Sequence, residues 1–569
     1  MIRRVDIRRR PIPDRLPEGE PLIARIMASR GAEALPDYRL DRLLAPTLGG
    51  LDRAVDLLCQ AIASDQKILI VGDFDADGAT GTTLAVRALK AMGARQVDWL
   101  VPDRFRHGYG LSPGLVDEIA EPAPDLVVTV DQGISSVNGV ARARQRGMRV
   151  IVTDHHLPGP QLPAADAIVN PNLPGETFDS RALAGVGVMF YLVMALRAGL
   201  RDRGWFEQHR QPRLDQWLDL VALGTVADLV PLDENNRRLV WQGLKRIRSG
   251  RCAPGLRALL EVAGRNLNHV SAADLGFAAA PRLNAAGRLD DMSHGIRCLL
   301  ADNERQAHEL AARLDELNRT RQQIQADMQA LAEAQAERLA DQVDGPLKGL
   351  CVFDETWHQG VVGLVAGRLA DRLRRPVIAL APDEPGSDWL KGSGRSPSGV
   401  HMRDLLVDID AAHPELIARF GGHARAAGLS LAREQLDRFR QAFGQQLETL
   451  SFSADQVLTD GELPPDRLDV ATALSLVEAG PWGQGWPEPL FDGRFHVADR
   501  RIVGERHLKL TLTPVGGDQT IDAIAFNAGP LCHESLPDPL HLTYRLEVNR
   551  WQGRVSPQLN IQHLVSKVG

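Results

Sequence analysis

The chain has 569 residues, of which 44% are hydrophobic and 24% charged, and its formal net charge is −7. A chain of this length and ordinary composition predicts several globular domains and excludes a fibrous or disordered protein. The longest apolar stretch, residues 186–196, is too short to span a membrane, and the basic start lacks the apolar segment of a secretory signal. The five cysteines form no CxxC pair, which favours a reducing, cytoplasmic setting and no membrane partner.

The first 48 residues form a Pro- and Arg-rich segment. From residue 49 to 300, short β-rich runs alternate with helical patterns, and this alternation predicts βαβ units with a mostly parallel sheet. An aspartate ends each of four such runs, residues 67–73, 96–103, 125–131 and 148–154. Ligands bind at the carboxyl ends of parallel strands, so these aspartates lie where a site is expected.

Three further segments follow along the chain. Residues 301–344 contain no Gly or Pro and predict one or two long helices that connect domains, with a coiled-coil dimer as the alternative. A second β/α pattern covers residues 345–450, and a β-rich pattern with Gly and Pro turns covers residues 453–569. The expected fold class is therefore α/β, with a parallel-sheet domain, a long connecting helix, a second α/β domain and a C-terminal β-barrel.

The segment GDFDADG, residues 72–78, places three aspartates on alternate positions after an apolar strand. Two like charges 4 Å apart repel by about 4 kcal/mol at an effective dielectric of about 20, so cations, protons or solvent must accommodate them. The segment is no EF-hand loop, because Leu84 stands where a bidentate glutamate is needed and a strand precedes it. It is no P-loop either, because no GK[ST] follows Gly72. For an isolated DxD, solvated turn aspartates remain the alternative.

Other strand ends carry similar side chains. Asp131 follows one strand, Asp154, His155 and His156 follow the next, and Asp228 lies in an apolar run further on. A single aspartate of this kind is often a helix cap or an ion-pair partner, but several at one sheet edge predict a metal site. Carboxylates with imidazole suit Mn²⁺ or Mg²⁺, with Zn²⁺ or Co²⁺ possible, and their number suits two ions about 3.5–4 Å apart.

These segments resemble a known family. DHH (Asp154 to His156), GDFDADG, VDQGISS and TVADLVPL resemble the motifs of the DHH phosphoesterase superfamily, and GGHARAAG (residues 421–428) resembles the signature of its DHHA1 domain. Together with PRLNAAGRL (residues 281–289), WHQGVVGLVAGRL (residues 357–369) and the β-rich end, they resemble the RecJ family of single-strand-specific 5′→3′ DNA exonucleases. The resemblance covers nearly the whole chain from about residue 25 and implies an OB-fold for the last domain.

The resemblance implies two divalent metal ions, Mn²⁺ first and Mg²⁺ as the alternative. The implied ligands are Asp73, Asp75, Asp77, Asp131, His155 and Asp228. Asp131 and Asp77 count among the catalytic residues, with Asp131 as the bridge between the ions, and His156 is expected to face the scissile phosphate. Asp154 is expected to orient one of the histidines, and whether Asp73 binds metal directly or supports a neighbour stays open.

The resemblance also implies a set of substrate contacts: Arg104, Tyr109, Arg282, Asn284, Arg288, Ser393, Gly394, Arg395 and His423. Ser393, Gly394 and Arg395 correspond to a pocket for the 5′-phosphate, where a guanidinium can bind an anion with two hydrogen bonds. A surface ion pair is the alternative for each arginine. The chain departs from the family at His107, where a glutamate is usual. Trp482, Trp486 and Phe491 are candidates either for base stacking or for core packing.

The implied function is metal-dependent hydrolysis of single-stranded DNA from its 5′ end to 5′-mononucleotides, in DNA recombination and repair. A single-strand-binding protein and a helicase are the implied partners. One alternative is a DHH phosphodiesterase that acts on oligoribonucleotides or cyclic dinucleotides. Another is a non-catalytic scaffold with a decayed site, against which the intact aspartates and DHH motif argue.

Overall fold

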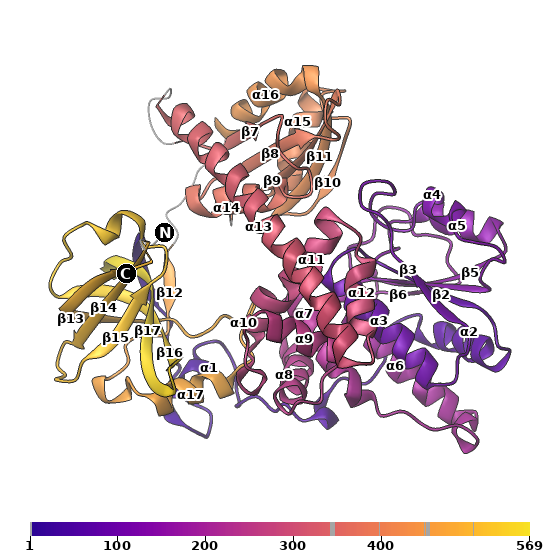
Figure 1. The fold of residues 1–569 in the computed structure, drawn as a ribbon, viewed down its shortest axis with the longest axis horizontal. Coiled ribbons are helices and arrows are strands. Elements are labelled where there is room, and N and C mark those ends of the chain that lie inside the picture. Colours follow the sequence, from indigo (N-terminus) through magenta and orange to yellow (C-terminus); the bar gives the residue numbers. More distant parts are fainter. Residues whose placement is uncertain are drawn as a thin grey trace. The chain divides into compact units, whose positions relative to one another are not determined.

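The computed structural model describes residues 3–341, 347–397, 399–448, 450, 456–504 and 506–568. The chain divides into two compact units (Figure 1). The first unit contains residues 1–315 and 455–569, and the second contains residues 316–454. The first unit therefore combines segments from both ends of the chain.

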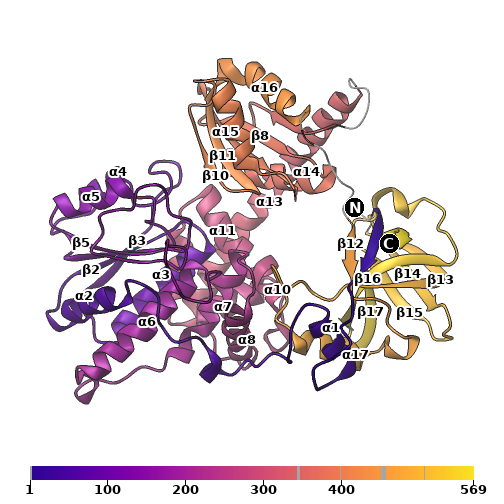
Figure 2. The ribbon, with the colours of Figure 1, turned by 180° about the vertical axis from the view of Figure 1, so that it is seen from behind.

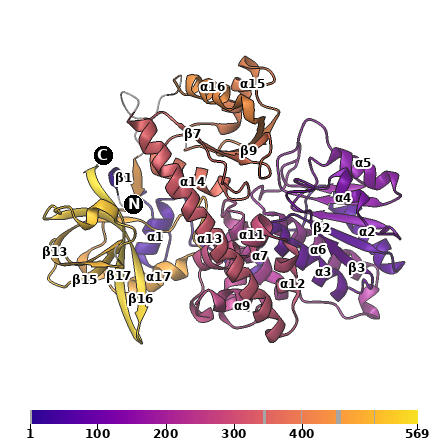
Figure 3. The same cartoon turned by 45° about the horizontal axis from the view of Figure 1, so that its top comes forward.

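A five-stranded parallel sheet lies in the first unit (Figures 1 and 3). Its strands, in spatial order, are β3 (Val97–Leu100), β2 (Ile68–Gly72), β4 (Leu126–Val130), β5 (Arg149–Thr153) and β6 (Ala167–Val169). Because β2 has β3 on one side and β4 on the other, the chain reverses its direction across the sheet at β2. Ligands of such sheets bind at this switch point, beyond the carboxyl ends of the strands.

Helices cover both faces of the sheet (Figure 2). One group consists of α2 (Leu51–Ala63), α3 (Ala76–Ala91) and α6 (Gly185–Asp202), and α6 packs on both of the others. The other consists of α4 (Pro113–Asp117) and α5 (Val137–Gln145), which share a core with β4 and β5. Connections between parallel strands are right-handed. The chain moves in one direction across the sheet from β2 to β3 and in the other direction from β3 to β4, so the helices of these two connections lie on opposite faces.

A helical region follows the sheet in the first unit. Its helices are α7 (Leu218–Ala227), α8 (Glu234–Arg248), α9 (Pro254–Val262), α10 (Ala272–Asp274), α11 (Ala280–Leu289) and α12 (Ser293–Leu300), with one π-helical turn, η5 (Leu275–Ala279), between α10 and α11. The apolar helix α7 is buried along most of its length and ends at Asp228. α13 (Glu304–Ala340) is a single long helix that starts in this unit and continues into the second.

The second unit contains a mixed five-stranded sheet with helices. The strand order is β10 (Arg419–Gly422), β11 (Ala426–Ala432), β9 (Trp389–Arg395), β8 (Val377–Pro382) and β7 (Leu350–Phe353). The pair of β7 and β8 is parallel, whereas the other pairs are antiparallel. The helices are α14 (Val362–Leu373), α15 (Met402–Ala412) and α16 (Leu436–Glu448), and α15 and α16 contribute to a core with β8, β9 and β11.

The C-terminal part of the first unit is a β-barrel. The ring closes through β17 (Arg554–Val568), β15 (Ile521–Ala525), β14 (His507–Pro514), β13 (Phe491–Val503) and β16 (Leu540–Trp551), because β16 pairs with both β13 and β17. A closed ring of five strands is the architecture of an OB-fold. α1 (Pro21–Ala28) and α17 (Val470–Ala479) pack on each other in the same unit.

The N-terminal segment contributes a strand to this barrel. β1 (Arg4–Arg9) lies between β17 and β12 (Val457–Thr459) and pairs in parallel with both. Arg9 donates a hydrogen bond of 2.7 Å to the buried carboxylate of Asp492 on β13. The segment of residues 1–48 and the C-terminal barrel, expected from the sequence as separate parts, are thus joined by a strand pairing.

The fold class predicted from the sequence is confirmed, with its parallel sheet, its long helix, its second α/β sheet and its barrel. For the aromatic segment, the contacts favour core packing over base stacking. Phe491 is fully buried in the barrel, and Trp486 is buried under the guanidinium of Arg237, 4.0 Å from the ring centroid. Trp482 donates a hydrogen bond from its indole to the Leu476 carbonyl. Within the described residues, none of the helices combines the length and the apolar character that a membrane crossing requires.

Candidate metal centre

The loop after β2 carries the three alternating aspartates. Asp73 follows the last residue of β2 and is 5% exposed. Asp75 is the N-cap of α3, where its side chain accepts a hydrogen bond of 2.9 Å from the Gly78 amide. This cap explains why a helix can begin within an acidic loop, because the amides at a helix start favour a carboxylate.

Asp77, in the first turn of α3, is held in place by hydrogen bonds from the N-terminus of another helix, α6. Its two carboxylate oxygens accept hydrogen bonds from the amides of Gly185 and Val186, at 2.6 and 3.0 Å. Those amides belong to the first turn of α6, whose N-terminus favours the ionised form of this carboxyl. Gly224 of α7 lies against the same carboxylate, and a Cβ there would be 2.7 Å from Asp77 Oδ1. The close approach of α7 thus requires glycine.

Asp131, which follows β4, is 1% exposed and adopts a left-handed backbone conformation, with φ at 61°. A Cβ at Gly185 would lie 2.4 Å from the Asp131 Cβ, so the start of α6 also requires glycine beside this residue. Strained backbone of this kind persists where the surrounding structure determines it and is typical of functional sites.

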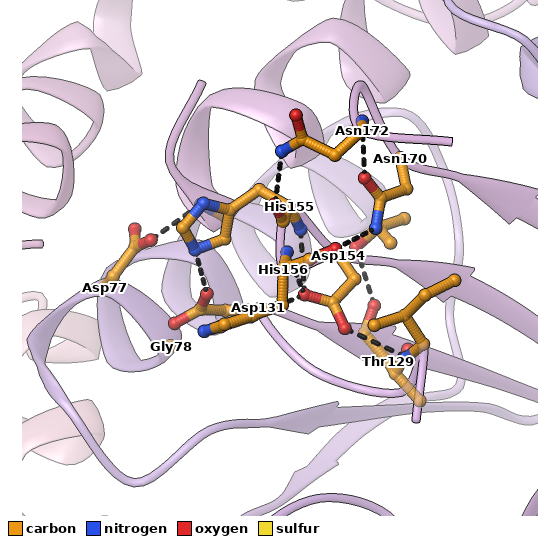
Figure 4. A network of polar contacts seen from close by, with 12 residues as sticks. Asp77, Gly78, Thr129, Asp131, Asp154, His155, His156, Asn170 and Asn172 are labelled. Carbon is orange, nitrogen blue, oxygen red and sulfur yellow. Dashed lines mark hydrogen bonds and ion pairs between the residues drawn. The ribbon is translucent and has the colours of Figure 1, made fainter. Parts of the chain in front are cut away.

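The DHH segment follows β5 and places its two histidines differently (Figure 4). His155 Nε2 lies 3.0 Å from Asp131 Oδ1 and 3.4 Å from Asp228 Oδ2. His156 Nδ1 lies 2.8 Å from Asp154 Oδ1. Asp154 also accepts hydrogen bonds from the amides of His155, His156 and Ile134, so it is saturated and orients the segment.

The predicted ligands form overlapping groups, and in each group the potential ligand atoms lie within 4.8 Å of one another. The groups are Asp131 with His155 and His156, Asp77 with His155 and Asp228, and Asp73 with Asp75 and Asp131. Two groups share Asp131 and two share His155, which is the arrangement that two neighbouring ions need. The structure brings all six predicted ligands to the switch point of the sheet.

Buried atoms of this centre make no hydrogen bond to any residue that the structure describes. They include Asp73 Oδ1, and also Asp131 Oδ1 and His155 Nε2, which lie 3.0 Å apart without the alignment of a hydrogen bond. Buried polar atoms are nearly always paired, because an unpaired one loses its interaction with water. These oxygen and nitrogen atoms fit divalent cations as their missing partners.

The carboxyl groups repel one another in a buried place. Burial and the neighbouring Asp75 raise the pKa of Asp77 to about 7 and raise the pKa of Asp73 well above its usual value. Burial, with Asp77 and Asp75, also raises the pKa of Asp131. Such carboxyls hold protons near neutral pH unless cations replace them.

The two histidines differ in charge at neutral pH. Burial and the neighbouring His156 lower the pKa of His155 to about 4, so its ring is neutral, as a metal ligand must be. Burial alone would lower the pKa of His156, but the hydrogen bond to Asp154 and the negative charges of nearby aspartates together outweigh it and raise this pKa to about 9. His156 is therefore a cation at neutral pH, and 44% of its side chain is exposed.

Two asparagines that the sequence analysis did not single out support the DHH loop (Figure 4). Asn170 and Asn172 donate side-chain hydrogen bonds to the carbonyls of His156 and His155, at 2.9 and 2.5 Å. Asn170 directly follows β6, and this position at the carboxyl end of a strand is the sequence feature that could have identified it as a residue of the site.

Arg104 and Tyr109 also lie at the centre. The Arg104 guanidinium stacks over the Phe74 ring, 4.2 Å from its centroid, and the Tyr109 hydroxyl lies 3.1 Å from His156 Nδ1 and 3.2 Å from the Asp131 carbonyl. His107, at the position where the family has glutamate, lies 3.1 Å from the carboxylate of Glu118.

The residues predicted on α11 differ in their surroundings. Asn284 accepts a hydrogen bond of 2.8 Å from the Ala76 amide, so it supports the loop of the three aspartates. Arg282 forms an ion pair of 2.7 Å with Asp315, and both side chains are largely buried. Arg288 is half-buried near the end of the helix. Substrate contact by these residues stays a prediction.

Ser393, Gly394 and Arg395 lie on β9 in the second unit. Arg395 donates hydrogen bonds to Ser393 Oγ at 2.8 Å and to the Gly394 carbonyl at 2.9 Å. No described carboxylate pairs with Arg395, and burial lowers its pKa. Gly363, in the first turn of α14, lies against these side chains, since a Cβ there would be 3.0 Å from the guanidinium. His423 lies between β10 and β11, where its amide donates to the Ala426 carbonyl.

A parallel sheet whose switch point gathers aspartates and a neutral histidine into overlapping ligand groups is the arrangement that a metal-dependent phosphoesterase of the α/β class needs. Comparison with known proteins agrees. Models of three domain families match the chain: the DHH family N-terminal domain at residues 67–225, the DHHA1 domain at residues 347–449 and the RecJ OB domain at residues 459–563.

Whole proteins match along their full length. The chain is 52% identical to the single-stranded-DNA-specific exonuclease RecJ of Dickeya dadantii (strain 3937), over 98% of each chain, and 49% identical to that of Escherichia coli (strain K12), over 99% and 100%. The crystal structure of RecJ in complex with Mn²⁺ from Thermus thermophilus is similar with a TM-score of 0.77 at 31% identity, covering 96% of this chain and 76% of that one. The chain belongs to the RecJ family.

Proposed function

We propose that the protein is a metal-dependent exonuclease specific for single-stranded DNA, which hydrolyses the strand from its 5′ end and releases 5′-mononucleotides. The observation that carries this proposal is the set of potential metal-ligating atoms gathered at the switch point, in a chain 52% identical over 98% of its length to a single-stranded-DNA-specific exonuclease. DNA recombination and repair are the processes in which such an activity is needed.

Asp77, His155 and Asp228 would hold one divalent ion, and Asp73, Asp75 and Asp131 would hold the other, with Asp131 close to both. Mn²⁺ and Mg²⁺ are each found in a related structure, at 31% and 30% identity. When bound, such a pair activates water and stabilises the charge of the attacking and leaving oxygens of a phosphodiester.

The chain's own residues orient the substrate and control protons at the site. Asp154 accepts a hydrogen bond from His156 Nδ1, so the protonated ring keeps a second N–H, at Nε2, that can donate to the scissile phosphate. The Tyr109 hydroxyl, which lies between His156 and the Asp131 carbonyl, restrains this ring further.

The 5′-phosphate would bind to Arg395 and Ser393, where a buried guanidinium has no described carboxylate partner and lies beside the first turn of α14. A charge-assisted hydrogen bond to a phosphate would supply what that buried cation lacks. Contacts to phosphate carry no sequence information, so the enzyme should degrade strands of any sequence.

A long strand is a better candidate substrate than a short oligonucleotide or a cyclic dinucleotide. The identity to the exonucleases extends over the C-terminal barrel, and OB-folds bind single strands by their backbone and bases. A single-strand-binding protein and a helicase as partners, and the cytoplasm as the place of action, belong to this proposal.

The test uses purified protein with end-labelled single- and double-stranded DNA, with Mn²⁺ and with a chelator. We expect a 5′ label to appear at once as a mononucleotide, a 3′ label to remain on shortening strands, and duplex DNA to persist. Arg395→Ala should reduce the preference for a 5′-phosphorylated over a 5′-hydroxyl strand. A first product from the 3′ end, or equal turnover of duplex, would refute the proposal.

A further inference from the structure

Two exposed apolar residues, Phe277 of η5 and Leu229 after α7, lie on neighbouring segments, and α7 ends at Asp228 of the metal centre. The two residues expose 81% and 66% of their surface. Single exposed apolar side chains are common on proteins, but a group of them at a binding site marks contact with a partner.

The backbone segments that carry Leu229 and Phe277 lie next to each other, on either side of the Val226 carbonyl. The Val226 carbonyl oxygen accepts a hydrogen bond of 3.3 Å from the Leu229 amide. The same oxygen lies 4.0 Å from the place that a Cβ at Gly276 would take, and Phe277 is the next residue. Leu229 directly follows Asp228, one of the carboxylates predicted to bind metal, and Phe277 starts from the neighbouring backbone.

Both residues lie where the backbone departs from regular structure. Leu229 has a φ of 59°, in the left-handed region that branched side chains rarely adopt. Phe277 lies in η5, and single π-helical turns are frequent at functional sites. Leu275 and Ala278 of that turn are buried, so the turn is anchored while Phe277 faces outward.

The helix that follows Phe277 also fixes the metal centre. α11 begins directly after η5, and its Asn284 accepts the hydrogen bond from Ala76 in the loop of the three aspartates. A Cβ at Gly287 would lie 1.9 Å from the Phe74 carbonyl, so this helix and the loop are in close contact. The position of Phe277 is thereby tied to that of the ions' ligands.

We infer that Phe277 stacks on an unpaired base of the DNA strand next to the scissile phosphate, with Leu229 against the same nucleotide. This inference rests on the proposed function. Every base has an aromatic face, so the contact tolerates any sequence. In a duplex the faces of a base are covered by its neighbours and its position is fixed by pairing, so the contact also favours a single strand.

The experiment compares strands of deoxyadenosines that carry one abasic nucleotide at successive positions from the 5′ end. For the wild-type enzyme, we expect one position at which loss of the base raises KM by about 5- to 100-fold, the range of one base–aromatic stack. Phe277→Ala should raise KM for the intact strand by a similar factor and remove the effect of that abasic position. Phe277→Tyr, which keeps the ring, should behave as the wild type does.

Within one variant, the ratio of KM for the abasic strand to KM for the intact strand does not depend on the fraction of folded enzyme. The test therefore holds even if a variant is less stable. Leu229→Ala should raise KM less than Phe277→Ala, and Leu474→Ala, which removes an exposed leucine of α17, should leave KM unchanged. An abasic effect that persists in Phe277→Ala would overturn the inference, as would a variant that changes self-association and not KM. Wild-type protein that degrades no single strand would refute the proposed function instead.

Discussion

Asp131 combines the features that distinguish the metal centre from a solvated acidic turn. It is buried, its backbone is left-handed, and its Oδ1 makes no hydrogen bond to a described residue. Each feature is unfavourable for the folded protein without ions, because strain, repulsion and desolvation act on one residue. The two glycines that approach this carboxylate and that of Asp77, Gly185 and Gly224, show that the surrounding helices are built around them.

We predict that Asp131→Asn abolishes hydrolysis and stabilises the metal-free protein. The folded-state pKa of Asp131 lies above its unfolded value, so its favourable contribution is present at low pH and is lost as the pH rises. The neighbouring Asp77 has a pKa of about 7, so its own carboxyl adds to this loss of stability as the pH rises toward neutrality. Asparagine tolerates left-handed backbone and carries no charge, so at pH 8 in a chelator the melting temperature should rise by about 2–4 °C.

Thermal unfolding at pH 5 is the control for this prediction, since protonation of the folded wild-type carboxyls should reduce the difference in melting temperature between the two proteins. Normal turnover of the variant with Mn²⁺ would contradict the assigned role. So would a metal-free variant less stable than the wild type at pH 8.

The positions of single site residues were predictable from the sequence where the residue directly follows a β-strand. Asp73, Asp131 and Asp154 each follow a strand, and parallel strands bring their carboxyl ends to one edge. The partners of Arg282 and the packing of Trp486 were not predictable, because Asp315 and Arg237 reach them only through tertiary structure.

At the scale of elements, the barrel depends on a strand from the other end of the chain. β1 covers what would otherwise be the edges of β12 and β17, and Arg9 on β1 binds the Asp492 carboxylate together with Thr459 and His541. Burial raises the pKa of Asp492, but the hydrogen bonds from His541, Arg9 and Thr459 lower it to about 2. A buried carboxylate thus has its hydrogen bonds supplied by three separate strands.

We predict that Arg9→Met destabilises the protein by about 1–3 kcal/mol at pH 7, because it removes a donor from a buried carboxylate. The folded-state pKa of Asp492 is below its unfolded value of about 4, so the stabilisation exists above that pH and is lost as the pH falls toward 2. The urea midpoint of unfolding, measured at pH 7 and pH 3, should therefore differ between variant and wild type mainly at pH 7.

Arg8→Met is the matched control, because Arg8 is an exposed arginine on the same strand. It should leave both midpoints nearly unchanged. Equal losses in the two variants at pH 7 would show that general positive charge on β1, and not the pairing with Asp492, stabilises the barrel.

The alternation of strands and helices in the sheet, the long α13 and the barrel were predictable from periodicity and turn residues. The pairing of β1 was not. Its sequence, RVDIRR, is short and rich in arginine, and its partners come more than 400 residues later, so no local pattern indicates them.

At the scale of the whole molecule, the metal centre is a product of the sheet topology. Its predicted ligands come from loops after β2, β4 and β5, from the first turn of α3 and from the end of α7, and the switch point between β2 and β4 brings them together. A net charge of −7 gave no sign of a nucleic-acid substrate, because part of the acidic total belongs to groups that cations neutralise.

Anomalous diffraction from a crystal soaked in Mn²⁺ tests this centre most directly. We predict two neighbouring peaks at the switch point, one among Asp77, His155 and Asp228 and the other among Asp73, Asp75 and Asp131. Side chains that point away from one another with no peak between them would contradict the account.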